Sequence, residues 1–324
     1  MRRRLPIALA AAGAAAAAAW VVTSWIVARS LARRLISPQG LTPCQASRDG
    51  LLSGLAAAGA RVHDYRFAGS TRRHDELCAI LATPSAGPSP RTIVFLHGKG
   101  GSAAEWAPDA LRAVGLGYNA LLPDLRGHRP SGGDFITYGL LEREDLDAAV
   151  AAAEARFGFD ASRLAVHSCS AGSSTALVWA ATEPRVRGIW LESPFADARE
   201  MARHYLSILT GLPRPILGLT TTFAVRRALK SLRDSLGVTP EEILASDPLR
   251  SAARVRVPVH VVFGDEDFLV PPRFTQRLID ALPAGTTLWN PRGAGHCHHD
   301  NEAEKIHERE YVKRWKAFFE QVLG

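Results

Sequence analysis

Residues 163–174 place a serine between a short apolar run and a run of small residues, and this pattern constrains the fold more than any other stretch. The segment Arg163-Leu-Ala-Val-His-Ser-Cys-Ser-Ala-Gly-Ser-Ser174 predicts a buried strand, a tight turn and the start of a helix. Its centre, Ser168-Cys-Ser-Ala-Gly172, has the spacing of a G-x-S-x-G turn, with serine in place of the first glycine. Such a turn is strained, and the residues two before and two after the central serine must be small. The turn therefore presents one serine hydroxyl at the carboxyl end of a sheet.

Two serines in this turn are candidates for that hydroxyl. Ser170 has Ser168 and Gly172 at the crowded positions, and both are small. With Ser168 at the centre, the β-branched Val166 would stand at a crowded position, where it fits badly. Ser170 is therefore the preferred nucleophile.

A serine nucleophile needs a base, and the base needs an acid that orients it. Residues 257–263 form an apolar, β-branched run that predicts a buried strand, and Asp265 and Asp267 follow it. A second short strand over residues 286–290 leads into a glycine-containing loop with His296, the predicted base. Asp265, Asp267 and, more remotely, Glu192 at another strand end are the candidates for the acid.

Two further segments lie upstream of the serine turn, and the first of them follows a predicted strand. Residues 91–96 lead into His97-Gly-Lys-Gly-Gly-Ser102, where backbone N–H groups can face a developing oxyanion. Residues 121–123 lead into Asp124-Leu-Arg-Gly-His-Arg-Pro-Ser131. We expect His97 and His128 to support these loops rather than to act as bases.

With these pieces in this order, residues 60–324 resemble the α/β-hydrolase superfamily, in particular bacterial serine hydrolases of the prolyl-oligopeptidase-like and serine-aminopeptidase-like groups. The family motifs H-G-x-G-G, D-x-R-G-x-G-x-S, G-x-x-D-x-x-V-P and G-x-G-H match residues 97–101, 124–131, 264–271 and 293–296. Arg129 departs from the second motif, which has glycine there. The resemblance selects Asp267 as the acid. It implies an α/β fold with a mostly parallel eight-stranded sheet, helices on both faces and a helical cap insertion.

The resemblance also implies a serine hydrolase that cleaves an ester, thioester or amide through an acyl-enzyme. Ser170, His296 and Asp267 would form the triad, and the N–H groups of Lys99 and Ala171 would bind the oxyanion. A carboxylesterase or lipase-like activity on a small-molecule, acyl or peptide substrate is preferred. A peptidase or acyltransferase with the same triad remains open, as does an inactive membrane-tethered binding protein. Dehalogenases and epoxide hydrolases of this fold need Asp at the position of Ser170, so these two activities are disfavoured. The mechanism requires no metal and no cofactor.

The amino terminus predicts a membrane anchor over residues 1–36. Residues 5–28 are uncharged, which is long enough for a bilayer that needs about 20 residues, and arginines flank both ends. Trp20 and Trp25 suit an interface. A cleaved signal peptide with an Ala-x-Ala site over residues 17–19 is the alternative, but the apolar run continues past that site to a basic stop. We expect a single-pass anchor in a bacterial-type cytoplasmic membrane, with the catalytic domain outside the cytoplasm.

The positive charge belongs mostly to this anchor. The chain carries a formal net charge of +7, and six arginines lie in residues 1–34 without any acid, so the remainder is close to neutral. Nucleic-acid binding is therefore not supported.

The rest of the chain divides into a linker over residues 37–59 and a hydrolase domain over residues 60–324. Residues 195–256 are too long for a simple crossover and predict the helical cap. Residues 223–233 of this cap mix apolar and basic side chains. An amphipathic helix packed on its own domain is preferred over a lid that touches the membrane or an acyl chain. The acids of residues 142–147 predict a solvated helix start.

The four cysteines show no metal-binding spacing. Gly295-His-Cys-His-His299 resembles a zinc cluster, but the preferred interpretation has His296 as the base and His298 and His299 as polar loop residues. Cys169 predicts a buried, inert thiol. Because Cys169 and Cys297 each adjoin a triad member, a redox effect on activity is the alternative.

Overall fold

The computed structural model describes residues 4–38, 47–70, 75–298 and 301–324. Within these residues the strands form one eight-stranded sheet in the order β1-β2-β4-β3-β5-β6-β7-β8. β2 runs antiparallel to both of its neighbours, and the other pairs are parallel, which confirms the predicted sheet. The strands are β1 Arg61–Ala68, β2 Glu76–Thr83, β3 Arg91–Leu96, β4 Asn119–Asp124, β5 Arg163–Cys169, β6 Val186–Glu192, β7 Val259–Val262 and β8 Thr287–Trp289.

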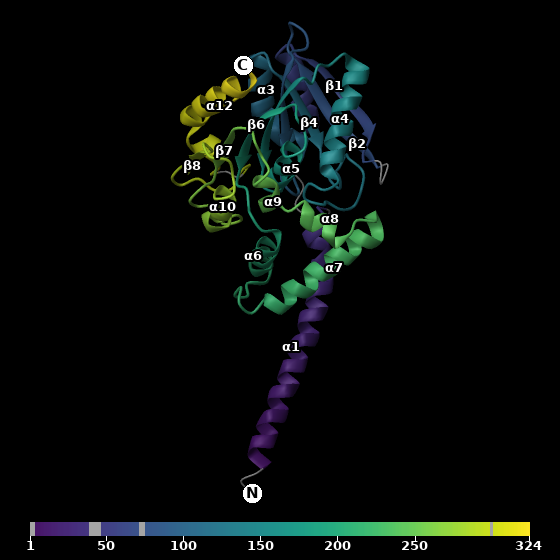
Figure 1. Cartoon of the computed structure of the whole chain (residues 1–324), viewed down its shortest axis with the longest axis vertical. Coiled ribbons are helices and arrows are strands. Elements are labelled where there is room, and N and C mark those ends of the chain that lie inside the picture. The colour runs from purple at the N-terminus through teal and green to yellow at the C-terminus, as the bar shows by residue number, and fades with distance from the viewer. Residues whose placement is uncertain (1–3, 39–46, 71–74, 299–300) are drawn as a thin grey trace.

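Helices cover both faces of the sheet, as expected for a parallel sheet whose central strands are almost fully buried (Figure 1). Apolar side chains of one face form a core with α4 Glu142–Phe157, α5 Ala171–Ala180, α9 Pro248–Ala252 and α10 Pro272–Ile279. The core of the other face includes α2 Arg48–Ala57, the 3-10 helix η1 Ala103–Trp106, α3 Ala107–Gly115, α11 Ala303–Ile306 and α12 Glu308–Leu323.

The predicted cap lies between β6 and β7 and contains α6 Ala198–Thr210, α7 Gly218–Leu236 and α8 Pro240–Ala245 before α9 returns the chain to the sheet. The side chain of Asp197 accepts N–H bonds at the start of α6, and Gly211 and Gly237 end α6 and α7 in the left-handed conformation. α7 buries Ala224, Ala228 and Leu232 along one face and exposes basic residues on the other. α7 is therefore an amphipathic helix, and its apolar face packs against α1 and α6.

A long amino-terminal helix, α1 Arg4–Ile36, projects away from the sheet and helices (Figure 1). Its residues Ala12–Ile36 suit a membrane span by length and composition, the one such helix in the described part of the chain. Its carboxyl-terminal half packs against α7, where small residues, Ser24, Ala28 and Ala32, recur every fourth position. This half of α1 thus shares an apolar core with the cap.

Candidate active site

Ser170 occupies the turn between β5 and α5. Its backbone has φ 50° and ψ −117°, a strained conformation for a residue with a side chain. Ser170 is half-buried, whereas Ser168 is fully buried and its Oγ donates to the carbonyl oxygen of Trp190 at 3.2 Å. The turn therefore presents Ser170, and not Ser168, toward the surface.

The loop after β3 presses against this turn. A Cβ at Gly172 would lie 2.4 Å from the carbonyl oxygen of Leu96, and one at Gly98 would lie 3.3 Å from the Cβ of Ser170. Lys99 follows Gly98 directly. Ala171 is the first residue of α5, so its N–H has no acceptor within the helix. Both predicted oxyanion donors thus lie on segments that flank Ser170.

The structure pairs His296 with Asp267. The Nδ1 of His296 lies 2.8 Å from Oδ2 of Asp267, whose side chain is fully buried. The other oxygen of Asp267 accepts the N–H groups of Leu269 at 3.0 Å and Val270 at 2.7 Å, which orients the carboxylate. A ring nitrogen of His296 and the sulfur of Cys169 belong to one group of atoms within 4.8 Å of each other. The imidazole therefore lies beside the turn that carries Ser170.

The two other candidate acids have different partners. Asp265 accepts the N–H of Gly293 at 2.6 Å and so closes the loop that leads to His296. Glu192 lies 2.9 Å from His167 Nε2 and accepts a hydrogen bond from the hydroxyl of Tyr311 at 2.5 Å. Burial raises the pKa of Glu192, but its hydrogen bonds outweigh burial and bring the pKa to about 2. Glu192 thus remains an ionised member of a buried cluster.

Cys169 and Cys297 form a disulfide with a Cα–Cα distance of 6.2 Å and a sequence separation of 128 residues. The prediction of an inert thiol at Cys169 is therefore wrong. The bond joins the residue before Ser170 to the residue after His296. Cys169, His296 and Cys297 lie close enough together to bind a metal ion. Both sulfurs belong to the disulfide, however, so neither is available as a thiolate ligand in this structure. His299 lies outside the described residues.

His97 and His128 connect the loop after β3 to the loop after β4. The Nε2 of His97 accepts the N–H of Leu125 at 3.0 Å, and the Nε2 of His128 accepts the N–H of Gly100 at 3.0 Å. Burial lowers the pKa of His97 to about 4 and that of His128 to about 3, so both rings are neutral at pH 7. This geometry supports the expectation that these rings hold loops in place.

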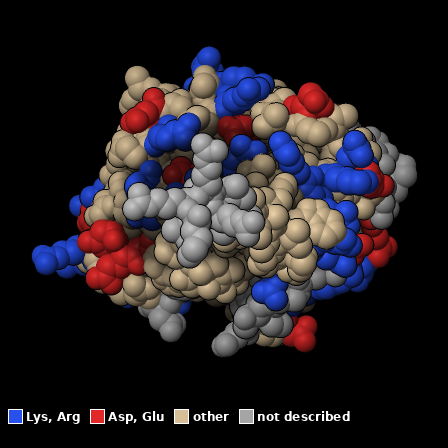
Figure 2. All heavy atoms as spheres, turned by 90° about the horizontal axis from the view of Figure 1, so that it is seen from below, with Lys and Arg blue, Asp and Glu red and all other residues tan. Residues whose placement is uncertain are grey.

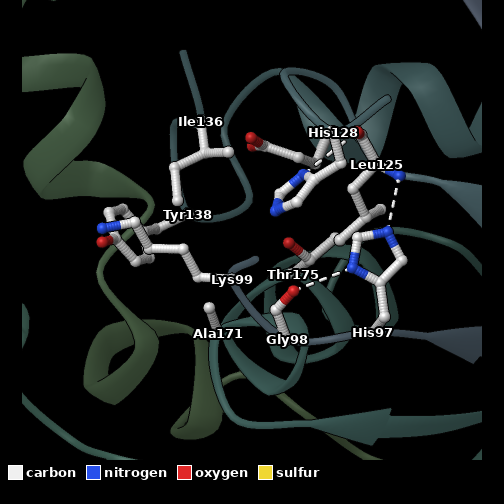
Figure 3. A pocket seen from close by; sticks show the side chains of 10 residues that line it. His97, Gly98, Lys99, Leu125, His128, Ile136, Tyr138, Ala171 and Thr175 are labelled. Carbon is white, nitrogen blue, oxygen red and sulfur yellow. Dashed lines mark hydrogen bonds between the residues drawn. The ribbon is translucent and has the colours of Figure 1, made fainter. Parts of the chain in front are cut away.

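A small, partly open cavity lies beside Ala171. Figure 3 shows the side chains of Lys99 and Tyr138 together at one side of this cavity, and the rings of His97 and His128 at the other. Leu125 and Ile136 add apolar surface to its lining. Burial lowers the pKa of Lys99 to about 8. The cavity beside Ala171 is thus narrow, and its lining combines polar and apolar side chains.

The acids at the start of α4 contradict the predicted solvated helix start, because Glu142 and Asp145 are buried. Glu142 accepts the N–H of Gly139 at 2.8 Å and that of Thr137 at 2.7 Å. Asp145 lies 2.6 Å from the Nε of Arg126. These contacts hold the loop that brings Tyr138 to the cavity, and they join segments whose proximity the local sequence does not reveal.

Comparison with known families bears on this geometry. Residues 93–309 match the model of the alpha/beta hydrolase family. The chain belongs to the alpha/beta hydrolase family. Among curated proteins, "Uncharacterized protein YqkD" of Bacillus subtilis (strain 168) is 26% identical over 212 residues, which cover 64% of this chain and 66% of that protein. The match thus spans less than two thirds of that relative.

Solved structures of other alpha/beta hydrolases share the fold. The Pyrococcus furiosus esterase Pf2001 superimposes with a TM-score of 0.64 at 18% identity, covering 83% of this chain and 94% of the esterase. A Mycobacterium tuberculosis puromycin-hydrolyzing peptidase gives 0.60 at 20% identity, covering 83% and 40%. A bacterial membrane phospholipase A gives 0.55 at 17% identity and covers 99% of both chains. Identities this low establish the fold alone. The family match supports a hydrolase, and the choice between ester and peptide substrates remains open.

Proposed function

We propose that this alpha/beta hydrolase is a membrane-anchored carboxylic ester hydrolase that uses Ser170, His296 and Asp267. The observation that carries the proposal is the buried His296–Asp267 pair at 2.8 Å beside the strained turn of Ser170. A serine, an imidazole and a carboxylate in this order are the groups that acyl transfer through an acyl-enzyme requires.

Each group has a defined role in the proposed reaction. His296 takes the proton of the Ser170 hydroxyl as the oxygen attacks the ester carbonyl. Asp267 accepts the Nδ1–H of His296, which assigns the role of base to Nε2 and stabilises the imidazolium. The N–H groups of Lys99 and Ala171 bind the oxyanion, and one such donor contributes about 2.7–4 kcal/mol to transition-state stabilisation. His296 then protonates the leaving alcohol, and it activates the water that releases the acyl group.

An ester is preferred over a peptide because the cavity beside Ala171 is narrow, and Leu125 and Ile136 give it apolar surface. The esterase and the membrane phospholipase A among the similar structures agree with this preference. The peptidase among them keeps amide cleavage as the second candidate. Rates on a short p-nitrophenyl ester and on an aminoacyl p-nitroanilide distinguish the two, and a higher kcat/KM on the anilide would reverse the assignment.

Fluorophosphonate labelling of the full-length protein in detergent tests the nucleophile. We expect labelling of the wild type and of Ser168→Ala, the matched control in the same turn, and no labelling of Ser170→Ala. Hydrolysis should fall by roughly 10⁴- to 10⁶-fold in Ser170→Ala, as it does when other serine hydrolases lose a triad member. Labelling that survives in Ser170→Ala, or a folded wild type that neither labels nor hydrolyses esters, would contradict the proposal.

We also propose that α1 stays attached and that the catalytic domain lies outside the cytoplasm. The disulfide between Cys169 and Cys297 supports this side of the membrane, because disulfides persist in oxidising compartments and are rare in the cytosol. Protease added to spheroplasts should remove the domain while a cytoplasmic marker survives. Protection of the domain in intact spheroplasts would place it on the cytoplasmic side.

A further inference from the structure

The carboxyl-terminal end of α1 forms hydrogen bonds with residues that line the cavity. The hydroxyl of Tyr138 donates to the carbonyl oxygen of Leu35 at 2.5 Å, and the N–H of Ile136 donates to that of Ile36 at 2.7 Å. The Nζ of Lys99 donates to the carbonyl oxygen of Arg34. The last carbonyls of a helix lack partners within the helix. Here the residues that supply partners belong to the cavity wall, so the apolar helix ends at the cavity itself.

The turn between α6 and α7 carries a cluster of exposed apolar side chains. Leu212 and Ile216 are 42% and 45% exposed, and Ile208 and Leu209 are exposed as well. In Figure 1 this turn is the part of the cap that reaches furthest along α1 toward the amino terminus. Clustered exposed apolar residues on one tip indicate a contact with another apolar phase.

Basic side chains lie on the helices next to this turn. α7 exposes Arg226, Arg227, Lys230 and Arg233, and Asp234 is its one acidic residue. Exposed arginines also follow the apolar part of α1, beginning at Arg29. Seen from the amino-terminal side, Lys and Arg side chains lie across the upper and right parts of this face with Asp and Glu side chains among them, and uncharged surface lies beside them (Figure 2). An apolar tip next to basic residues matches the chemistry of an anionic lipid surface.

The distances fit a bilayer at this face. From Arg29 to Ile36, α1 rises about 10 Å, at 1.5 Å per residue. The headgroup region on each side of a bilayer is about 5–7 Å thick. If the membrane-spanning part of α1 ends near Arg29, an ester at the membrane surface lies within about one headgroup layer of the cavity wall.

We infer that the α6–α7 turn and the basic face of α7 dock on the anionic bilayer that holds α1, and that the hydrolase takes long-chain acyl esters directly from this bilayer. The inference rests on the proposed ester hydrolysis and on α1 as the membrane span. A bilayer is favoured over a protein partner because the apolar tip, the basic helix and the candidate span share one face.

The test compares two substrates in one preparation. The full-length protein is reconstituted in vesicles of phosphatidylethanolamine and phosphatidylglycerol, with p-nitrophenyl palmitate dissolved in the bilayer or p-nitrophenyl butyrate in the water. We expect the double variant Leu212→Glu/Ile216→Glu to lose about tenfold or more of the palmitate rate, because a carboxylate at each position opposes burial of the turn in the acyl layer. The butyrate rate should stay within about twofold of the wild type, since a tenfold change would require 1.4 kcal/mol at the reacting groups.

Leu116→Glu is the matched control, because Leu116 is 40% exposed and follows α3 at the end of the domain remote from α1 (Figure 1). This variant should hydrolyse both substrates like the wild type. A double variant that keeps the wild-type palmitate rate, or that loses both rates equally, would overturn the docking surface.

A second readout needs no hydrolysis. An environment-sensitive NBD dye attached to Leu212→Cys should shift its emission to the blue and brighten when the protein is reconstituted, more so with phosphatidylglycerol than with phosphatidylcholine alone. The same dye on Leu116→Cys should keep its aqueous spectrum. Insertion of the dye without hydrolysis of either ester would refute the proposed function alone. Hydrolysis with an aqueous spectrum at position 212 would refute the docking surface alone.

Discussion

Replacing both Cys169 and Cys297 with alanine removes the cross-link between the turn of Ser170 and the loop of His296. The closed loop spans 128 residues, for which chain entropy accounts for about 5 kcal/mol, and removal of a native disulfide typically costs 2–5 kcal/mol. A chain of 324 residues has an unfolding entropy of about 0.7 kcal/mol/K, so a loss of about 2–5 kcal/mol lowers Tm by about 3–7 °C. Alanine is used in place of serine because both cysteines are buried, and the unpaired hydroxyl of a buried serine would destabilise the fold on its own.

The same change should lower the rate of reaction. The disulfide holds the serine turn and the histidine loop at one distance, and a displacement of about 1 Å between reacting groups can cost 100-fold in rate. We expect kcat on p-nitrophenyl butyrate to fall by about 10- to 100-fold well below Tm, with little change in KM. Wild-type protein treated with a phosphine reductant should behave like the double variant.

Thermal unfolding, steady-state kinetics and non-reducing peptide mapping measure these effects together. Cys78→Ala is the control, because Cys78 is the free, buried cysteine of the described chain and its loss breaks no cross-link. The reasoning is refuted if the mapped peptides show a Cys169–Cys297 bond and the double variant still matches the wild type in Tm and kcat. It is also refuted if Cys78→Ala produces the same losses.

Two further predictions concern the loop after β3. Gly172→Ala should abolish fluorophosphonate labelling, because its Cβ would lie 2.4 Å from the carbonyl oxygen of Leu96. Gly115→Ala is the control and should label normally, because a Cβ there has no neighbour within 4 Å. Equal labelling of both variants would contradict the crowding argument. The pKa of His128 is about 3 in the folded protein and 6.5 for an ordinary histidine in the unfolded chain. The unfolded chain therefore binds a proton first as the pH falls. The contribution of His128 is complete above pH 6.5 and is lost toward pH 3, with about 2 kcal/mol gone at pH 5. Chemical denaturation of the wild type and of His128→Gln from pH 7 to 5 measures this difference in the free energy of unfolding. If the two free energies changed with pH in parallel, the neutral ring of His128 would not be needed to accept the N–H of Gly100.

Local sequence predicted the strand ends that carry the candidate triad. The small residues around Ser170, the apolar run before Asp267 and the glycine-containing loop of His296 each describe a strand and the turn after it, and the structure places them after β5, β7 and β8. Parallel strands end at the same edge of a sheet, so correct strand assignments already bring the three segments together. The steric requirements of the turn also favoured Ser170 over Ser168 as the nucleophile.

Other features depend on contacts that no local pattern contains. Glu142 and Asp145 have the composition of a solvated helix start, yet α4 turns both toward the loops of Thr137 and Arg126, and those partners make their burial possible. A sequence shows which side chains are charged. It does not show which face of a helix a distant loop covers.

The sequence by itself determined the fold family, the order of the candidate site residues and the presence of an apolar amino-terminal helix, because each is encoded in contiguous residues. Tertiary structure alone decided that Cys169 meets Cys297 across 128 residues and that α1 packs on α7 and ends at the cavity of Lys99 and Tyr138. The physical reason is that these contacts join surfaces formed by separate segments, and such surfaces exist only after the sheet and the cap have assembled.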